Sequence, residues 1–239
     1  MFNYTIAYQL AQHVSQPLRL KEEITVAGGK LREENGKLLG EIQLSEENDE
    51  KAIRRATEIA NIVAHSFALL NNIGLRVQDL AIKSRVASDE RGVSIGLYAS
   101  IKASATVFVT IGKESEAELA KYVEALNRVS PETRVLIDRA LHWFSRALLD
   151  EDPIDRFVGF CVGLEILGEV YFHSDTVTKR IQKLVEKFSE DSVRGKDITA
   201  FRGALLHSGQ KIEDVEKYAR VTNPIIRKAF QALLNVSAG

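Results

Sequence analysis

Cysteine, methionine and tryptophan each occur once in this chain of 239 residues, and proline occurs only four times. The single cysteine, Cys161, excludes an internal disulfide and the multi-cysteine spacings of structural zinc sites. The most apolar run, from Val158 to Phe172, is interrupted by Glu165 and Glu169 and is too short to span a bilayer. The first residues also lack the basic start and apolar core of a secretory signal. We therefore expect a cytoplasmic protein with no membrane span.

An excess of charge of one sign is also missing. The chain has 32 Lys and Arg residues against 33 Asp and Glu residues, which gives a net charge of −1. No global field therefore attracts nucleic acid or an acidic membrane, and any such binding needs a local patch. Apolar residues make up 45% and charged residues 27%, which is ordinary for a folded globular protein.

Residues 1–112 are predicted to form a small sheet covered by one long helix. Strand patterns cover residues 5–10, 20–27, 30–34, 37–44, 78–87 and 93–111. Asn35-Gly36, between two of these segments, is a strong signal for a two-residue hairpin turn. Ser45 to Asn48 then supply helix-start chemistry, and apolar residues recur from Ile53 to Leu70 at helical spacing. This half is expected to be an α+β module.

Residues 130–239 are predicted to form an all-helical bundle, reached through a linking helix at residues 113–129. Helix starts are expected at Ser130-Pro131, at Asp152-Pro153, near Asp175 and near Asp197. The first two combine an N-cap residue with proline at the first helical position. Asn223-Pro224 lies inside the last helical pattern, so we expect that helix to kink or restart there.

Two charged residues fall among apolar residues on these helices. In the helix that starts at Pro153, Glu165 projects between Ile154 and Val158, inside the apolar arc, at about 100° per residue. Arg202 likewise projects from the apolar side of the helix that starts near Asp197. An unpaired buried carboxylate costs several kcal/mol or stays protonated. We therefore expect Glu165 and Arg202 to meet.

His207 follows Arg202 by five residues, close to a helix end marked by Ser208-Gly209. In an ideal helix the two side chains leave the axis about 140° apart. They share one site only if the last turn unwinds or if a second subunit completes the site.

These residues resemble a known family. Arg202-Gly-Ala-Leu-Leu-His207 is similar to the Rx4–6H motif of the HEPN superfamily. The segments that begin at Leu141 (Leu-His-Trp-Phe-Ser-Arg-Ala-Leu), Asp155 (Asp-Arg-Phe-Val-Gly-Phe) and Leu164 (Leu-Glu-Ile-Leu) are similar to Apea-like HEPN domains. The resemblance covers roughly residues 130–235, a little under half of the chain. It implies that the C-terminal part is a HEPN-like helical bundle.

Many HEPN proteins are metal-independent endoribonucleases of toxin–antitoxin or antiviral systems that act as dimers, and others are noncatalytic. The resemblance places the arginine and histidine of the motif at Arg202 and His207, with Glu165 as the supporting acid. The residue after the arginine, often polar in active members, is Gly203 here. The resemblance further implies no metal or cofactor, a homodimer formed through the helical domain, and RNA and an inhibitory protein as partners.

The chemistry of the three side chains suits this function. His207 can act as general base or acid near neutral pH, and Arg202 can stabilise the charge that develops on a phosphate. Glu165 would orient Arg202. Three alternatives stay open: a structural ion pair between two helices, a noncatalytic protein that only dimerises, and a nucleotide-binding module that uses Arg202.

Two basic stripes are candidates for contact with an RNA backbone. The first comprises Lys179, Arg180, Lys183, Lys187, Arg194 and Lys196. The second comprises Arg139, His142 and Arg146. A solvated helix face is the alternative for both stripes. Trp143 and Cys161 are expected to lie in the apolar core.

Overall fold

A computed structural model describes residues 1–12, 18–87, 109–111, 116–189, 195–208 and 212–234. The chain divides into two compact units, residues 1–67 with 75–123 and residues 68–74 with 124–239. The described residues form a five-stranded antiparallel sheet, a two-stranded sheet and seven helices. The expected α+β class is therefore confirmed. The boundaries predicted at residues 112 and 129 stay a prediction.

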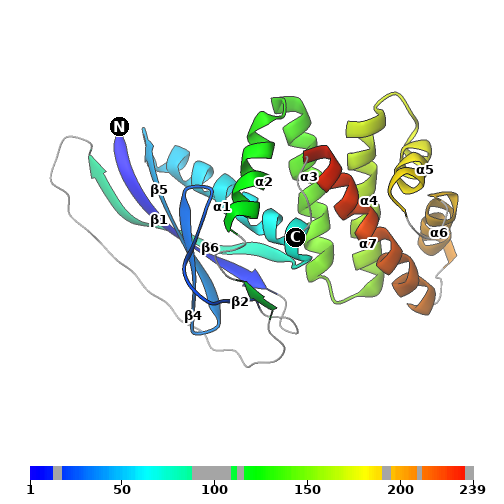
Figure 1. The fold of residues 1–239 in the computed structure, drawn as a ribbon, viewed down its shortest axis with the longest axis horizontal. Helices are drawn as coiled ribbons and strands as arrows, with labels where there is room; N and C mark the ends of the chain where they lie inside the picture. The colour runs from blue at the N-terminus through cyan, green and yellow to red at the C-terminus, as the bar shows by residue number, and fades with distance from the viewer. Residues whose placement is uncertain (13–17, 88–108, 112–115, 190–194, 209–211, 235–239) are drawn as a thin grey trace. The chain divides into compact units, whose positions relative to one another are not determined.

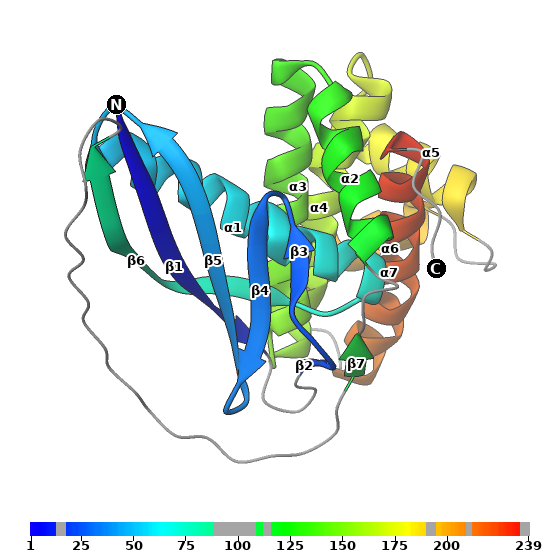
Figure 2. The same cartoon turned by 60° about the vertical axis from the view of Figure 1, so that its left-hand side comes forward.

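The first unit is built on the five-stranded sheet, whose strand order is β3-β4-β5-β1-β6. Its strands are β1 (Phe2–Gln12), β3 (Ile24–Val26), β4 (Gly29–Glu34), β5 (Lys37–Glu46) and β6 (Leu75–Ala87). Helix α1 (Asp49–Asn71) lies across one face of this sheet (Figure 2). A separate parallel pair joins β2 (Leu18–Leu20) to β7 (Val109–Ile111).

The predicted hairpin is confirmed. Asn35 and Gly36 have φ angles of 53° and 77°, and Glu34 pairs with Lys37 across the turn. Positive φ at both central residues is the geometry for which an Asn-Gly pair is favoured. The strand predicted at residues 20–27 is instead divided between β2 and β3. Of the strand predicted at residues 93–111, only 109–111 are described, and the rest lies outside the described residues.

Helix α1 begins where the sequence predicts. The side chain of Asn48 accepts a hydrogen bond from the backbone N–H of Lys51 at 2.9 Å, which is N-cap geometry. Its buried face includes Ala52, Ala56 and Ala60. Ile53, expected on that face, is 42% exposed, because small alanines rather than the isoleucine lie toward the sheet.

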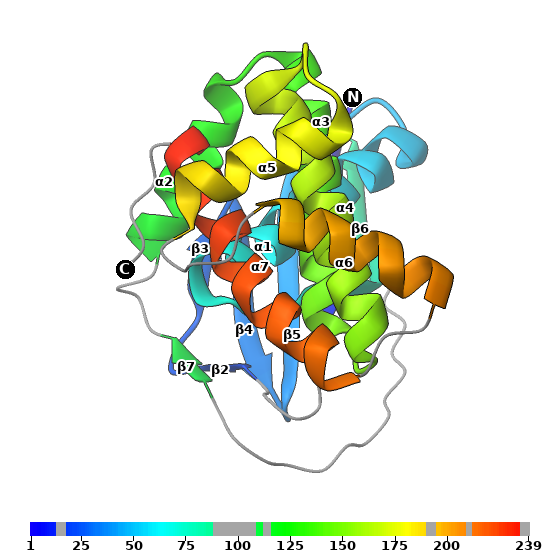
Figure 3. The same ribbon diagram turned by 90° about the vertical axis from the view of Figure 1, so that its right-hand side faces the viewer.

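The second unit is helical. Its helices are α2 (Glu116–Arg128, which begins in the first unit), α3 (Pro131–Leu149), α4 (Pro153–Phe172), α5 (Val177–Phe188), α6 (Gly195–Ser208) and α7 (Ile212–Leu234) (Figures 1 and 3). Both predicted proline starts are confirmed. Ser130 Oγ accepts from the backbone N–H of Thr133, and Asp152 Oδ1 accepts from that of Ile154.

Helices α3 and α4 pack antiparallel at close range through glycine. A Cβ atom on Gly159 would lie 2.9 Å from Ala147 Cβ, and one on Gly163 would lie 3.4 Å from the carbonyl oxygen of Ala140. Glycine therefore lets the two backbones approach. Helix α7 also packs on α4, and the hydroxyl of Tyr171 donates to the carbonyl oxygen of Ala229 at 2.7 Å.

The restart expected at Asn223-Pro224 is absent, because α7 runs as one helix from Ile212 to Leu234 with Pro224 inside it, and the alternative, a kink at this point, stays a prediction. Pro224 removes one backbone donor, but it lies on an exposed face where water can satisfy the free carbonyl. Ile225, Ile226 and Phe230 are buried on the other side and hold the helix against its neighbours.

Among the described residues, no single helix is long and apolar enough to cross a membrane. Only α4 and α5 together, bent by 87°, reach such a length and composition.

Candidate functional site

Glu165 and Arg202 meet, as the sequence predicts. Glu165 lies midway along α4, Arg202 lies on α6, and Arg202 Nη1 forms an ion pair with Glu165 Oε1. The two side chains are 21% and 28% exposed, so the pair is neither at the open surface nor in the deep core. Partial burial makes the attraction stronger than between two fully exposed charges, while part of the pair can still be reached from solvent.

An aromatic cluster joins the two helices that carry the pair to α7. The rings of Phe157 on α4 and Phe201 on α6 are 5.4 Å apart, and Phe201 stacks on Tyr218 of α7 at 4.2 Å. Phe201 directly precedes Arg202, so the packing of its ring fixes the rotation of α6 about its axis. That rotation places Arg202 against α4, which is how three helices position one guanidinium.

The buried thiol of Cys161 belongs to the same region. Cys161 lies one helical turn before Glu165 and is fully buried. Burial raises the pKa of the thiol to about 12, and the positive charge of Arg202 opposes that rise. The sequence analysis missed this neighbourhood, although the four-residue spacing to Glu165 places both side chains on one face of α4.

The guanidinium of Arg202 has a donor that the described residues do not satisfy. Its Nε is buried and has no hydrogen-bond partner among the residues that the structure describes. A guanidinium carries five N–H donors in a planar fork, and a buried donor without a partner is costly. Nε itself is covered, so a further acceptor such as a phosphate oxygen can meet only the 28% of the side chain that is exposed.

His207 lies in the last turn of α6, and its side chain lies outside the described residues. The backbone is helical through Ser208, so the last turn does not unwind. Position 207 is therefore about 140° around the axis from position 202. Of the two ways in which Arg202 and His207 could share a site, only the contribution of a second subunit remains.

Two members of the first basic stripe are engaged within the protein. Arg180 on α5 donates to the carbonyl oxygens of Phe172 and His173 at the end of α4, and it is 3.5 Å from Glu169. Lys183 Nζ is 2.6 Å from Asp175 Oδ2, a hydrogen bond that lowers the pKa of the Asp175 carboxyl. These two cations hold helix ends together.

Of the other four members of this stripe, two are exposed lysines and two lie wholly or partly outside the described residues. Lys179 and Lys187 are exposed on α5, and the Lys187 ammonium lies 5.0 Å from the ring centre of Tyr171. Lys196 lies in the first turn of α6, but its side chain is outside the described residues, as is the whole of Arg194.

Trp143, expected in the core, is instead partly exposed on α3. The guanidinium of Arg146 lies 5.4 Å from the centre of its ring system. Helical periodicity placed Trp143 among apolar residues, but it does not tell which of them a neighbouring helix covers. The second basic stripe therefore runs beside an accessible aromatic side chain.

Among the described residues, no three His, Cys, Asp or Glu side chains gather closely enough to hold a metal ion. Comparison of the chain with protein-family models, with curated proteins and with solved structures finds no match.

Proposed function

We propose that this chain is a HEPN-like RNA-binding protein that cleaves RNA without a metal ion and acts as a homodimer. The observation that supports the proposal most is the Glu165–Arg202 ion pair, which joins the two elements of the motif that lie on different helices. The resemblance of residues 130–235 to Apea-like HEPN domains supplies the reaction class. An inhibitory protein that restrains the activity belongs to the same proposal.

The proposed reaction uses the 2′-hydroxyl of the substrate as nucleophile. Its oxygen bonds to the adjacent phosphorus, the bond from phosphorus to the 5′-oxygen breaks, and the products are a 2′,3′-cyclic phosphate and a 5′-hydroxyl. One proton leaves the 2′-hydroxyl and one reaches the leaving 5′-oxygen; His207 is the base for the first transfer or the acid for the second, and water carries the other proton. Arg202 stabilises the charge on the phosphorane, and Glu165 positions Arg202. DNA lacks the 2′-hydroxyl and is not a substrate.

A second copy of the chain completes the proposed site. On the side of α4 that carries Glu165, three apolar residues are partly exposed: Val158, Val162 and Ile166. Nothing among the described residues lies within 4 Å of where a Cβ atom on Gly203 would be, so another backbone can approach α6 closely there. A two-fold interface over this surface would bring Arg202 of one protomer toward His207 of its partner.

Purified protein incubated with labelled RNA in EDTA tests the activity. The wild type should release fragments that end in 2′,3′-cyclic phosphate, and His207→Ala should release none. His173→Ala is the matched control, because His173 is an exposed histidine at the end of α4 and should leave cleavage unchanged. Equal cleavage by wild type and His207→Ala, or none by either, overturns the proposed activity.

Mixing two inactive variants tests whether the site is shared. If each site takes Arg202 from one protomer and His207 from its partner, a heterodimer of Arg202→Ala and His207→Ala contains one intact site. Random exchange of protomers should then restore about a quarter of wild-type cleavage, because half of the dimers are mixed and each has one working site of two. No recovery on mixing contradicts the shared site.

A noncatalytic dimer is the second candidate. Gly203 stands where active members of the family often have a polar residue, and the partly exposed apolar residues of α4 suit association without chemistry. Concentration-dependent dimerisation with no cleavage in the EDTA experiment would favour this candidate.

A further inference from the structure

The outward face of α3 presents a line of basic side chains. Arg139, His142 and Arg146 are exposed, and their spacing of three and four residues puts them on one side of the helix. Arg139 and Arg146 are seven residues apart, which is about 10 Å along the helix axis. This is the second basic stripe of the sequence, and it lies apart from the Glu165–Arg202 pair, which belongs to α4 and α6.

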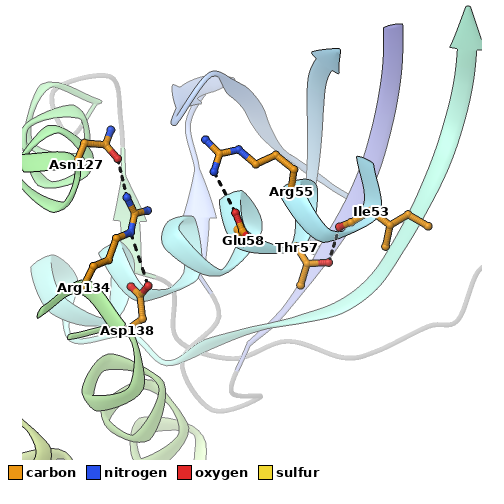
Figure 4. Close-up of polar contacts among 7 residues, drawn as sticks. All are labelled: Ile53, Arg55, Thr57, Glu58, Asn127, Arg134 and Asp138. Carbon is orange, nitrogen blue, oxygen red and sulfur yellow. Dashed lines mark hydrogen bonds and ion pairs between the residues drawn. The ribbon is translucent and has the colours of Figure 1, made fainter. Parts of the chain in front are cut away.

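The charges of the two arginines on this face are not neutralised by described parts of the protein. Neither Arg139 nor Arg146 forms an ion pair or hydrogen bond with a described residue. Arg134 on the same helix behaves differently, because it donates to Asn127 Oδ1 at 2.9 Å and lies 3.8 Å from Asp138 Oδ2 (Figure 4). The α3 face therefore holds two arginines whose donors are available to an external anion.

An aromatic side chain adjoins the two arginines. Trp143 is partly exposed, the guanidinium of Arg146 lies 5.4 Å from its ring centre, and the ring of His142 meets it edge-on at 6.4 Å. Surfaces that bind single-stranded nucleic acid combine cations that follow the phosphates with aromatic rings on which bases stack. The α3 face has both components within two helical turns.

The comparison with α5 favours α3. On α5, Arg180 is held by two carbonyl oxygens and Glu169, and Lys183 is held by Asp175, which leaves the lysines Lys179 and Lys187 exposed. The two exposed cations of α3 are arginines instead, whose planar fork of donors matches a phosphate better than the point charge of a lysine does. We propose that α3 binds single-stranded RNA, with phosphates against Arg139 and Arg146 and a base against Trp143. This inference rests on the proposed function, since it names where the substrate RNA is held away from the cleavage site.

Trp143 provides a local test, because it is the only tryptophan in the chain. The probe is a 2′-O-methyl oligouridine, which cannot be cleaved through a 2′-hydroxyl, and it is added to the full-length protein. Binding measured by anisotropy of the labelled probe should quench Trp143 fluorescence in parallel. Binding with unchanged Trp143 fluorescence shows that RNA is held elsewhere and overturns the inference.

Salt dependence measures the contribution of the two arginines. For single strands, the logarithm of the binding constant falls with the logarithm of salt concentration by about 0.7 per neutralised phosphate. Arg139→Gln/Arg146→Gln should therefore make this slope shallower by about 1.4, whereas Arg139→Lys/Arg146→Lys should keep it. The matched control, Lys179→Gln/Lys187→Gln, removes the same charge from exposed positions of α5 and should leave the slope unchanged.

The outcomes separate this inference from the proposed activity. Equal changes of slope in the α3 and α5 variants mean a diffuse field and overturn the α3 site. Tight binding of a base-free polyphosphate with no preference for RNA shows that the face recognises any polyanion, such as an acidic protein, and also overturns it. Trp143-dependent RNA binding without any cleavage in the EDTA experiment would leave the α3 site standing and remove only the nuclease. Absence of RNA binding overturns both.

Discussion

At the scale of single residues, removal of one partner of the Glu165–Arg202 pair is expected to cost more free energy than the attraction between the two charges contributes. Each partner is about three-quarters covered, so removal of one leaves a charge in a poorly solvated place. Replacement of both partners by apolar residues of similar size leaves no such charge. This difference separates a positioning role from a purely structural one.

We expect Arg202→Met to lower the free energy of unfolding by about 1–3 kcal/mol, less than for a fully buried pair because of the remaining exposure. The double variant Glu165→Leu/Arg202→Met should return to within about 1 kcal/mol of the wild type. Urea unfolding followed by circular dichroism measures both values. The double variant should nevertheless have no ribonuclease activity.

The control for this cycle is the exposed pair of Arg220 and Glu216 on α7, whose side chains are 81% and 46% exposed. Arg220→Met should change the free energy of unfolding by about 0.5 kcal/mol or less. A double variant at positions 165 and 202 that is as unstable as the single one would contradict the argument. Recovery of cleavage along with stability would show that the pair is only structural.

The contacts of a single residue could be predicted from sequence where leaving its side chain without a partner costs much free energy. Glu165 and Arg202 could be matched because a charge on an apolar helix face needs a partner wherever that partner lies. The partial exposure of Trp143 could not be predicted, because helical periodicity gives the direction of a side chain and not what covers it. The position of Cys161 near Arg202 could not be predicted either, because a buried thiol, unlike a buried charge, does not need a polar partner.

At the scale of helices, the space beside a glycine shows how closely a neighbouring helix packs there. A Cβ atom on Gly168 of α4 would lie 2.7 Å from Arg180 Cβ, so α5 is in contact at that point. A Cβ atom on Gly203 of α6 would meet none of the described residues within 4 Å. Glycine therefore marks a close helix contact on α4, whereas on α6 it lies beside open space among the described residues.

Gly168→Ala should destabilise the protein by about 1–3 kcal/mol, because α5 must shift to admit the methyl group. Gly203→Ala should stabilise it by about 0.5–1 kcal/mol, because alanine loses less backbone entropy in a helix. Both are measured by urea unfolding at low protein concentration, where the proposed dimer is dissociated. Destabilisation by Gly203→Ala under these conditions would show that α6 is covered within one chain.

Helix and strand limits could be predicted where local chemistry decides them. Ser130, Asp152 and the Asn35-Gly36 turn act through hydrogen bonds or φ preferences of neighbouring residues, and all three were confirmed. The continuity of α7 through Pro224 depends on the packing of Ile225 and Phe230 against other helices, which a local pattern does not contain.

At the scale of the whole chain, the helical unit is not one continuous stretch of sequence. Residues 68–74 at the end of α1 belong to it. The half-buried side chain of Arg227 on α7 donates to the carbonyl oxygens of Leu69 and Leu70, both at 3.0 Å. Burial lowers the pKa of this guanidinium, so the two carbonyls compensate a charge that would otherwise be poorly solvated.

A fragment of residues 113–239 should therefore be less stable than the same unit in the full chain by about 3–6 kcal/mol, the value of two charge-assisted hydrogen bonds. Trp143 fluorescence during urea unfolding compares the two proteins. Arg227→Met should stabilise the fragment and destabilise the full chain, because the partners are present only in the latter. A fragment as stable as the full chain would contradict this prediction.

Sequence patterns read in order could not find this connection, since nothing local marks residues 68–74 as part of a later unit.

The buried cysteine has a practical consequence. A thiol with a pKa near 12 is protonated at neutral pH, and a protonated thiol is a poor nucleophile. Cys161 is also enclosed on all sides. The native protein therefore reacts with maleimides almost as a cysteine-free protein does, so a single cysteine introduced at an exposed position such as Val135 would accept a fluorophore or spin label selectively.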